Sequence, residues 1–186
     1  MSSSTDTGIL ILTGPSGAGK TTLSKALLEQ KPGTLIMISY TTRSKRPGEV
    51  DGKDYFFVDK QEFQHLIDNG EMLEYAEVYG NLYGTSRSSI ERVLKAGKNI
   101  ILDVDWQGAQ AVKKHFPQAV SVYILPPDEN ATRNRLQSRG EDSQQIIESR
   151  MAAYTEQLSH QNDFDHVLIN QNLEDSIRKL GELAPF

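Results

Sequence analysis

Residues 14–21 read Gly14-Pro15-Ser16-Gly17-Ala18-Gly19-Lys20-Thr21, and this stretch decides the fold of the chain. It matches the phosphate-binding loop pattern G-x-x-x-x-G-K-[ST] at every fixed position. In such a loop the glycines let backbone N–H groups curve around phosphate oxygens, while Lys20 adds a positive charge and Thr21 offers a hydroxyl to Mg²⁺. A glycine-rich turn that binds nothing is the alternative, so the flanking sequence has to separate the two interpretations.

The residues on either side of the loop favour phosphate binding. Residues 8–13 (GILILT) form a short apolar run rich in β-branched residues, which predicts a buried parallel strand. After the loop, Leu23, Ala26 and Leu27 recur at helical spacing. A strand, a glycine loop and a helix in this order bring the partial positive charge of the helix N-terminus to the same phosphate.

The composition of the chain excludes several classes of protein. With 186 residues, one compact domain is expected, and a net charge of −5 gives no general attraction to nucleic acid or to an anionic membrane. The absence of cysteine excludes disulfides, thiolate metal sites and thiol catalysis. The first residues, MSSSTDT, contain no targeting pattern, and no apolar stretch reaches membrane-spanning length. We therefore expect a cytoplasmic protein whose residues 1–7 form a flexible tail.

Apolar runs alternate with helical patterns along most of the chain. Strands are predicted over residues 8–13, 34–39, 99–104, 119–124 and 165–169. Helices are predicted over residues 21–30, 107–115, 128–139, 143–160 and 173–184. The alternation predicts an α/β fold, in which a parallel β-sheet of the P-loop NTPase type is flanked by helices on both faces.

Residues 40–97 interrupt this rhythm and predict a small α+β insertion in the parallel core. After a turn-rich segment they form a short helix over residues 59–69, which starts with the capping pattern D-x-x-E. An extended piece at residues 72–79 is followed by a turn at residues 80–81. Further along, residues 136–150 are polar and predict a mobile connection between two helices.

A carboxylate at the end of a predicted strand points to a metal site. Residues 99–103 (NIILD) end in Asp103, where many phosphate-loop proteins place an acidic residue close to Mg²⁺. We predict that Thr21 and Asp103 hold Mg²⁺, with a turn or helix cap as the alternative role of Asp103. Residues 105–108 (DWQG) also fit the D-x-x-G pattern of GTP-hydrolysing switch proteins, but the N-K-x-D guanine motif of those proteins is missing from the sequence.

A long signature that follows the phosphate loop in the sequence indicates which molecule accepts the phosphoryl group. Residues 39–55 contain the pattern S-x-T-T-R-x-x-R-x-G-E-x-x-G-x-x-Y. Together with the phosphate loop, this signature closely resembles the guanylate kinase family, and the resemblance covers almost the whole chain. It continues at Glu74, Tyr83-Gly84-Thr85, Asp103-Val104-Asp105-Trp106-Gln107-Gly108, Pro126-Pro127 and Arg135-x-x-x-Arg139-Gly140. The resemblance implies an enzyme that transfers the γ-phosphate of ATP to GMP in the presence of Mg²⁺.

The basic turn of the insertion fits a phosphate clamp. Arg43 and Arg46 lie three residues apart, and with the phenol of Tyr55 they could hold a dianionic phosphate by charge-assisted hydrogen bonds. The resemblance assigns this phosphate to GMP and adds Tyr83 to the clamp. Taken alone, the run RSKR is also typical of an ordinary exposed charged loop.

To recognise guanine, a protein must accept hydrogen bonds from the N1–H and 2-amino groups of the base and donate one to its O6 atom. As the family pattern implies, the Glu74 carboxylate accepts from N1–H and the 2-amino group, while the hydroxyls of Ser39 and Thr85 serve O6. Asp105 is a further candidate for the 2-amino group. Adenine would leave Glu74 unpaired, and a site of this kind can reject the wrong partner by about 10⁴-fold.

Arginines near the end of the chain predict a catalytic lid. Arg135 and Arg139 lie one helical turn apart on one face, and Arg150 follows. On a closing lid they would stabilise the negative charge that spreads over the transferring phosphoryl group. A solvated helix face paired with neighbouring acidic residues is the alternative. The predicted catalytic residues are Lys20, Arg43, Arg135, Arg139 and Arg150. The predicted ATP-binding residues are Gly14, Pro15, Ser16, Gly17, Ala18, Gly19, Lys20, Thr21, Thr22 and Asn170.

The assignment of Asn170 rests on the family, which holds the adenine of ATP at this position. The acidic residue that usually follows it is Gln171 in this chain. We expect a single unit over residues 8–186. Its core comprises residues 8–39, 98–134 and 152–186, its GMP-binding insertion residues 40–97, and its lid about residues 135–151.

Two other functions remain open from the sequence. A kinase for a phosphorylated sugar can share this scaffold, but it needs no guanine contacts. A guanylate-kinase-like module that binds peptides without catalysis usually has a damaged phosphate loop, whereas the loop of this chain is intact. The expected partners are ATP and GMP, with neither nucleic acid nor membrane, while the use of dGMP and the oligomeric state are left open.

Overall fold

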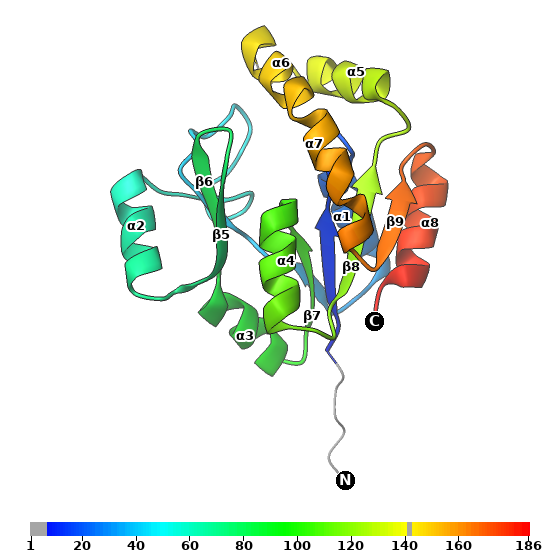
Figure 1. Cartoon of the computed structure of the whole chain (residues 1–186). Helices are drawn as coiled ribbons and strands as arrows, with labels where there is room; N and C mark the ends of the chain where they lie inside the picture. Colours follow the sequence, from blue (N-terminus) through cyan, green and yellow to red (C-terminus); the bar gives the residue numbers. More distant parts are fainter. Residues whose placement is uncertain (1–6, 141–142) are drawn as a thin grey trace.

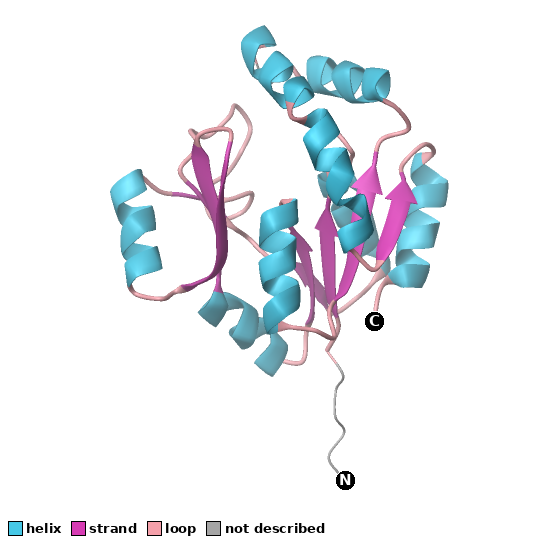
Figure 2. Cartoon of the chain, in the orientation of Figure 1, coloured by secondary structure: helices cyan, strands magenta, loops and turns pink. Residues whose placement is uncertain are grey.

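The computed structural model describes residues 7–140 and 143–186, and a five-stranded parallel sheet forms its centre (Figures 1 and 2). Except for its last residue, the predicted tail at residues 1–7 lies outside the described residues. The strands, in the spatial order β2-β7-β1-β8-β9, are β1 (Ile9–Thr13), β2 (Thr34–Ile36), β7 (Asn99–Asp103), β8 (Val120–Leu125) and β9 (His166–Ile169). All neighbours pair in parallel, which confirms the predicted α/β architecture.

Helices cover both faces of this sheet because its central strand is apolar on both sides. Ile9 and Ile11 of β1 pack toward α4 (Trp106–His115), and Leu10 and Leu12 pack toward α1 (Lys20–Gln30) and α8 (Leu173–Leu183). All five residues of β1 are buried, as expected for a strand in the middle of a parallel sheet. Among the described residues, no helix is long and apolar enough to span a bilayer.

Most predicted core elements are confirmed to within one residue at either end, but two differ in extent. The strand predicted over residues 34–39 ends at Ile36, because the chain then leaves the sheet and the Ser39 carbonyl accepts a hydrogen bond from Phe56 N–H in the insertion. The helix predicted over residues 143–160 divides into α6 (Gln144–Ala152) and α7 (Tyr154–Ser159), followed by the 3₁₀ turn η1 (His160–Asp163). The division redirects the chain from the lid back to the core sheet (Figure 1).

The insertion folds into a second sheet that lies beside the core (Figure 1). Its strands, in the order β4-β3-β6-β5, are β3 (Tyr40–Thr41), β4 (Phe56–Phe57), β5 (Met72–Val78) and β6 (Asn81–Ser86). The helix α2 (Lys60–Asp68) forms as predicted, and the Asp59 side chain caps it by accepting from Glu62 N–H at 2.8 Å.

The sequence interpretation missed four elements of the insertion, the strands β3, β4 and β6 and the helix α3 (Arg87–Lys95). The turn after β5 is Tyr79-Gly80, one residue earlier than predicted, and β6 follows it directly. Both turn residues have positive φ, 51° and 77°, which is common for glycine but rare for tyrosine. The helix α3 was missed although Ile90, Val93 and Leu94 are spaced as one face of a helix.

The residues predicted to form a lid lie in α5 (Glu129–Arg139) and α6, which lie above the core sheet (Figure 1). Leu136, Ile147 and Met151 form a small buried cluster together with Tyr154 of α7. The connection predicted over residues 136–150 overlaps the ends of both helices, because α5 continues to Arg139 and α6 begins at Gln144, and its mobility stays a prediction. Its remaining part includes residues 141–142, which lie outside the described residues.

Candidate active site

The phosphate loop packs closely against the C-terminal ends of β8 and β9. Gly14 has φ 131°, and a Cβ atom placed on it would lie 2.1 Å from the Ile124 carbonyl oxygen. Gly19 is the N-cap of α1 with φ 97°, and a Cβ atom there would lie 2.3 Å from Asn170 Nδ2. Both positions therefore require glycine. The helix α1 begins directly at the end of the loop, with Gly19 as its N-cap.

Lys20 and Thr21 occupy the positions that a triphosphate site demands. Lys20 Nζ donates to the carbonyl oxygens of Gly14, at 2.8 Å, and Pro15, at 3.2 Å, so its ammonium group lies across the loop. Thr21 Oγ1 donates to Asp103 Oδ2 at 2.9 Å. A hydroxyl oxygen and a carboxylate oxygen at this distance are a donor set that suits Mg²⁺.

Arg135 and Asn170 support the loop from the lid and from the core. Asn170 is buried, with 4% of its surface exposed, and its Nδ2 donates to the Ala18 carbonyl oxygen at 2.8 Å. Arg135 Nη1 donates to the same oxygen at 3.2 Å, and its Nη2 donates to the Asn170 carbonyl at 2.9 Å. One of the predicted lid arginines thus contacts the phosphate loop directly.

Arg150 joins the lid to the phosphate loop and to the insertion. Its Nη1 donates to Ser16 Oγ at 2.7 Å, and its guanidinium lies 5.6 Å from the centre of the Tyr79 ring. Tyr79 belongs to the tip of the β5–β6 hairpin, so three parts of the molecule meet at this cation. Arg139 is the last residue of α5, and its side chain lies outside what the structure describes.

The predicted phosphate clamp is organised around Glu49. Arg43 forms two hydrogen bonds with the Glu49 carboxylate, at 2.7 Å and 3.1 Å, and the same carboxylate accepts from Arg46 N–H at 2.8 Å. The Arg43 guanidinium lies 5.5 Å from the centre of the Tyr55 ring, and the rings of Tyr55 and Tyr83 are 6.0 Å apart. Arg43, Tyr55 and Tyr83 are therefore brought together as predicted from the signature.

The electrostatics of this cluster keep its donors charged or protonated. Burial by itself lowers the pKa of Arg43, but the hydrogen bonds and charges of Glu49 and Tyr83 outweigh it and raise that pKa above its ordinary value. Burial, with smaller contributions from nearby charges, also raises the pKa of Tyr55 well above its usual range. A permanent cation beside a protonated phenol is an arrangement that can donate to a phosphate dianion.

Glu74, Thr85 and Ser39 form a buried polar network. Thr85 Oγ1 donates to Glu74 Oε1 at 2.6 Å, and it lies 3.2 Å from Ser39 Oγ. Their exposed fractions are only 6%, 0% and 9%. Burial raises the pKa of the Glu74 carboxyl to about 7, while the bond from Thr85 opposes this rise and the nearby charge of Asp105 adds to it. The network thus places one carboxylate and two hydroxyl groups together, which are the kinds of group that the guanine prediction requires.

Asp105 and Gly108 border this network at the start of α4. Asp105 is the N-cap of the helix, and its Oδ1 accepts from Gly108 N–H at 2.7 Å. A Cβ atom placed on Gly108 would lie 2.5 Å from Glu74 Oε2. The second carboxylate predicted for guanine therefore lies close to the first.

Two residues of the site were not assigned a role from the sequence. Glu49 was part of the signature, and its place six residues after Arg43 in a turn-rich loop is the signal that could have identified it as the partner of that arginine. Gly108 appeared as the end of a D-x-x-G pattern and among the residues of the family resemblance, but without a role. Its contact with Glu74 joins residues 34 positions apart in the chain, so no local pattern reveals it.

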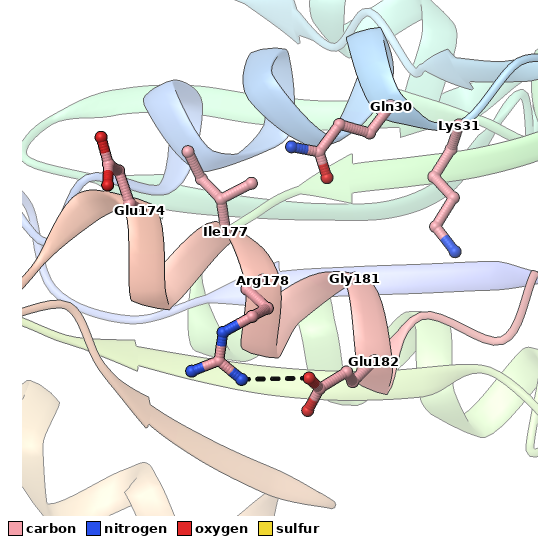
Figure 3. A pocket seen from close by; sticks show the side chains of 7 residues that line it. All are labelled: Gln30, Lys31, Glu174, Ile177, Arg178, Gly181 and Glu182. Atoms are coloured by element: carbon pink, nitrogen blue, oxygen red, sulfur yellow. Dashed lines mark hydrogen bonds and ion pairs between the residues drawn. The ribbon is translucent and has the colours of Figure 1, made fainter.

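A groove elsewhere on the surface contains none of the predicted site residues. It is lined by residues of α8 and of the C-terminal end of α1, namely Gln30, Lys31, Glu174, Ile177, Arg178, Gly181 and Glu182 (Figure 3). Arg178 Nη1 pairs with Glu182 Oε1 at 3.2 Å across this surface. Because the phosphate loop lies at the opposite end of α1, the groove is separate from the candidate active site.

Comparison with known proteins agrees with this geometry. A family model described as Guanylate kinase matches residues 6–184. The guanylate kinase of Thiobacillus denitrificans is 49% identical, and the match covers 93% of this chain and 83% of that protein. The guanylate kinase of Pseudomonas syringae pv. tomato is 47% identical, with 95% and 87% covered.

Solved structures show the same similarity at the level of the fold. A crystal structure of guanylate kinase from Anaplasma phagocytophilum matches with a TM-score of 0.78 at 34% identity, over 95% of this chain and 83% of that one. A shikimate kinase from Bacteroides thetaiotaomicron matches with a TM-score of 0.50 at 14% identity over 95% of this chain and 97% of that one, which indicates a shared fold only.

Proposed function

The chain belongs to the guanylate kinase family, and on this premise we propose which of its residues transfer the γ-phosphate of ATP to GMP, giving ADP and GDP. The observation that carries the assignment is the buried network of Glu74, Thr85 and Ser39, because a kinase for a phosphorylated sugar needs no groups that contact guanine. The intact phosphate loop speaks against a module that only binds peptides. ATP and GMP as substrates are consistent with an enzyme of the cytoplasm.

The donor side binds ATP through residues 14–22, with the backbone N–H groups of the loop around the phosphates. The N-terminus of α1 carries no side-chain cap, so its first N–H groups stay available for phosphate oxygens. Lys20 now bonds to loop carbonyls, and it turns toward the β- and γ-phosphates when ATP binds. Asn170 supports the loop beside the adenine end of the site.

Thr21 and Asp103 are the residues that would hold Mg²⁺ next to these phosphates. Their oxygen atoms are 2.9 Å apart in the structure, and both types of oxygen are ligands that the ion prefers. When bound there, Mg²⁺ neutralises part of the charge that develops on the transferring group.

The acceptor side binds GMP through the insertion. Arg43, Arg46, Tyr55 and Tyr83 hold the phosphate of GMP, with Glu49 keeping Arg43 in place. Glu74 accepts from N1–H and the 2-amino group of guanine, Ser39 and Thr85 serve O6, and Asp105 provides a second carboxylate near the 2-amino group. The GMP phosphate oxygen can then attack the γ-phosphorus in line, without a covalent enzyme intermediate.

The lid supplies charge for the transition state. Arg135 and Arg150 already contact the phosphate loop, and we propose that they act on the transferring phosphoryl group together with Arg139 and Lys20. Because α5 and α6 lie above the core and the insertion lies beside it, the two substrates come together when residues of about 135–151 and 40–97 close over the core (Figure 1). Such closure also excludes water and prevents the hydrolysis of ATP.

An acceptor comparison tests the function. The protein is incubated with ATP and Mg²⁺ plus GMP, dGMP, AMP, UMP or ribose 5-phosphate, and ADP release is followed with a coupled assay. We expect rapid ADP release with GMP and at least about 10³-fold slower release with AMP and UMP, because neither adenine nor uracil presents the paired N1–H and 2-amino donors of guanine to Glu74. Release with the sugar phosphate but not with GMP would overturn the assignment.

Lys20→Ala tests the role of the phosphate loop. We expect turnover to fall at least about 100-fold, because one fixed positive charge is lost at the transferring phosphate. Lys25→Ala is the matched control, since this lysine lies on the same helix and is exposed. Circular dichroism has to show that both variants remain folded. Activity close to that of the unmodified protein in Lys20→Ala would contradict the mechanism.

A further inference from the structure

Gly108 lies where two buried carboxylates converge. A Cβ atom built on it would lie 2.5 Å from Glu74 Oε2, 3.1 Å from Glu74 Cδ and 3.1 Å from Asp105 Oδ1. Contacts below 3.0 Å do not occur for real Cβ atoms, so any side chain at this position requires Glu74 to move. The residue is also inside α4, where it is buried.

The backbone of Gly108 gives no other reason for glycine. Its φ is not in the left-handed region, unlike that of the glycines in the phosphate loop. Its N–H donates to Asp105 Oδ1 at 2.7 Å, a bond that any residue except proline can make. Alanine favours a helix more than glycine does, so the helix alone would prefer a side chain here.

The atom that would have to move is the functional end of Glu74. Glu74 Oε2 is at the tip of a flexible side chain, so the fold can accept a methyl group by displacing the carboxylate rather than the backbone. The other oxygen of this carboxylate accepts from Thr85 at 2.6 Å, and Thr85 lies 3.2 Å from Ser39. Displacement of Glu74 therefore disturbs the whole network that faces guanine.

We propose that Gly108 is a positioning residue for the acceptor base: its missing side chain holds the Glu74 carboxylate in register with the N1–H and 2-amino donors of guanine, beside Asp105. The inference rests on the proposed function of Glu74. It assigns part of the guanine specificity to a backbone position that does not itself donate to or accept from the base.

Gly108→Ala tests this inference, with Gly181→Ala as a matched control. Gly181 also lies inside a helix, α8, and a Cβ atom there would meet Leu27 Cδ1 at an ordinary 3.8 Å. We expect Gly108→Ala to raise KM for GMP about 10- to 100-fold, since a displacement of about 1 Å can cost this much, while KM for ATP changes less than about twofold. Gly181→Ala leaves both constants unchanged. An unchanged KM for GMP in Gly108→Ala, or equal rises for GMP and ATP, would overturn the inference.

A second variant separates positioning from general damage. Glu74→Asp shortens the side chain by one methylene and withdraws its carboxylate from the added methyl group. We expect Gly108→Ala to raise KM for GMP less than about threefold in the Glu74→Asp background, whereas independent effects would multiply. Multiplying effects would contradict the proposal. Thermal unfolding of each variant shows whether it is folded. If Gly108→Ala alone does not fold, the double variant with Glu74→Asp still tests the positioning role.

The acceptor comparison keeps this test distinct from that of the function itself. If the unmodified protein releases no ADP with GMP, the proposed function fails before Gly108 is examined. If the unmodified protein does release ADP with GMP, but Gly108→Ala and Gly181→Ala have equal KM values for GMP, the inference about Gly108 fails while the function stands.

Discussion

Glu74 combines deep burial with an ionisable group, and this combination has a consequence for substrate binding. Burial raises the pKa of its carboxyl from 4.5 to about 7, even though Thr85 donates a hydrogen bond that opposes the rise. The carboxyl is therefore partly protonated at neutral pH. In the proposed binding mode guanine presents two donors to this carboxyl, so we expect GMP to bind the ionised form and to favour release of the proton.

GMP binding should therefore strengthen as the pH rises through about 7. With a pKa of about 7, the ionised fraction of Glu74 rises about tenfold between pH 6 and pH 8, and we expect KM for GMP to fall by a similar factor. In Glu74→Gln this dependence is lost, which separates it from the titration of the GMP phosphate. Glu77→Gln on the same strand, where the side chain is exposed, should keep it. A KM for GMP that rises with pH in the unmodified protein would contradict the prediction.

At the scale of elements, the helix starts differ in a way that matches their roles. The helices α2, α3, α4, α5, α6 and α8 begin with a side chain that accepts from their first turn. The helix α1 begins with Gly19 and has no such cap. In the proposed function, phosphate oxygens of ATP accept from its first N–H groups, whereas in each capped helix a side chain already accepts from one N–H of the first turn.

Asp105 caps α4, and we propose that it also faces guanine; substitutions can separate these two roles. Asparagine caps a helix about as well as aspartate, but alanine does not, so we expect only Asp105→Ala to lower the free energy of unfolding, by about 1 kcal/mol. Both variants lose the carboxylate, and we expect both to raise KM for GMP about five- to tenfold. The measurements are urea unfolding and steady-state kinetics.

The control for this comparison is Asn172→Ala. Asn172 caps α8 by accepting from Asp175 N–H at 3.0 Å, and its removal should cost similar stability without affecting KM for GMP. If Asp105→Asn binds GMP as well as the unmodified protein does, Asp105 acts as a cap alone and has no part in guanine recognition.

At the scale of the whole molecule, Tyr79 connects the insertion to the lid and the core. Its ring lies under the Arg150 guanidinium, and its hydroxyl accepts from Gln157 Nε2 of α7 at 3.1 Å. The carbonyl of Gln157 in turn accepts from the Tyr123 hydroxyl of β8. Arg150 also bonds to Ser16, so the hairpin tip lies where α6, α7 and the phosphate loop meet.

Removal of the Tyr79 contacts should weaken closure. We expect Tyr79→Phe, which loses the hydroxyl only, to lower kcat two- to threefold, and Tyr79→Ala, which also loses the ring under Arg150, to lower it about tenfold. Tyr75→Ala is the control, since this tyrosine is exposed on the same hairpin. Small-angle X-ray scattering with GMP and a non-hydrolysable ATP analogue should show a larger radius of gyration for Tyr79→Ala. Equal kcat values for the two alanine variants would contradict the prediction.

The sequence predicted the core elements well, because each of them has a local signal. The buried run before the phosphate loop, the helical spacing after it and the strand that ends in Asp103 all depend on neighbouring residues only. The insertion was harder to predict. Tyr79 adopts a positive φ in spite of its side chain, and the short strands β3 and β4 contain only two residues each, so they pair because the surrounding fold brings them together.

By itself, the sequence determined the reaction class and the substrates. The phosphate loop needs specific residues at fixed spacing, and the S-x-T-T-R-x-x-R signature carries the arginines that we propose bind the acceptor. The tertiary structure alone decided how these residues support one another: Glu49 on Arg43, Arg135 on the loop, and Gly108 against Glu74. Most of these contacts join different elements, and a change of a few tenths of an ångström in the distance would alter them. Such distances are set only when the parts of the fold pack together, so no pattern of neighbouring residues contains them.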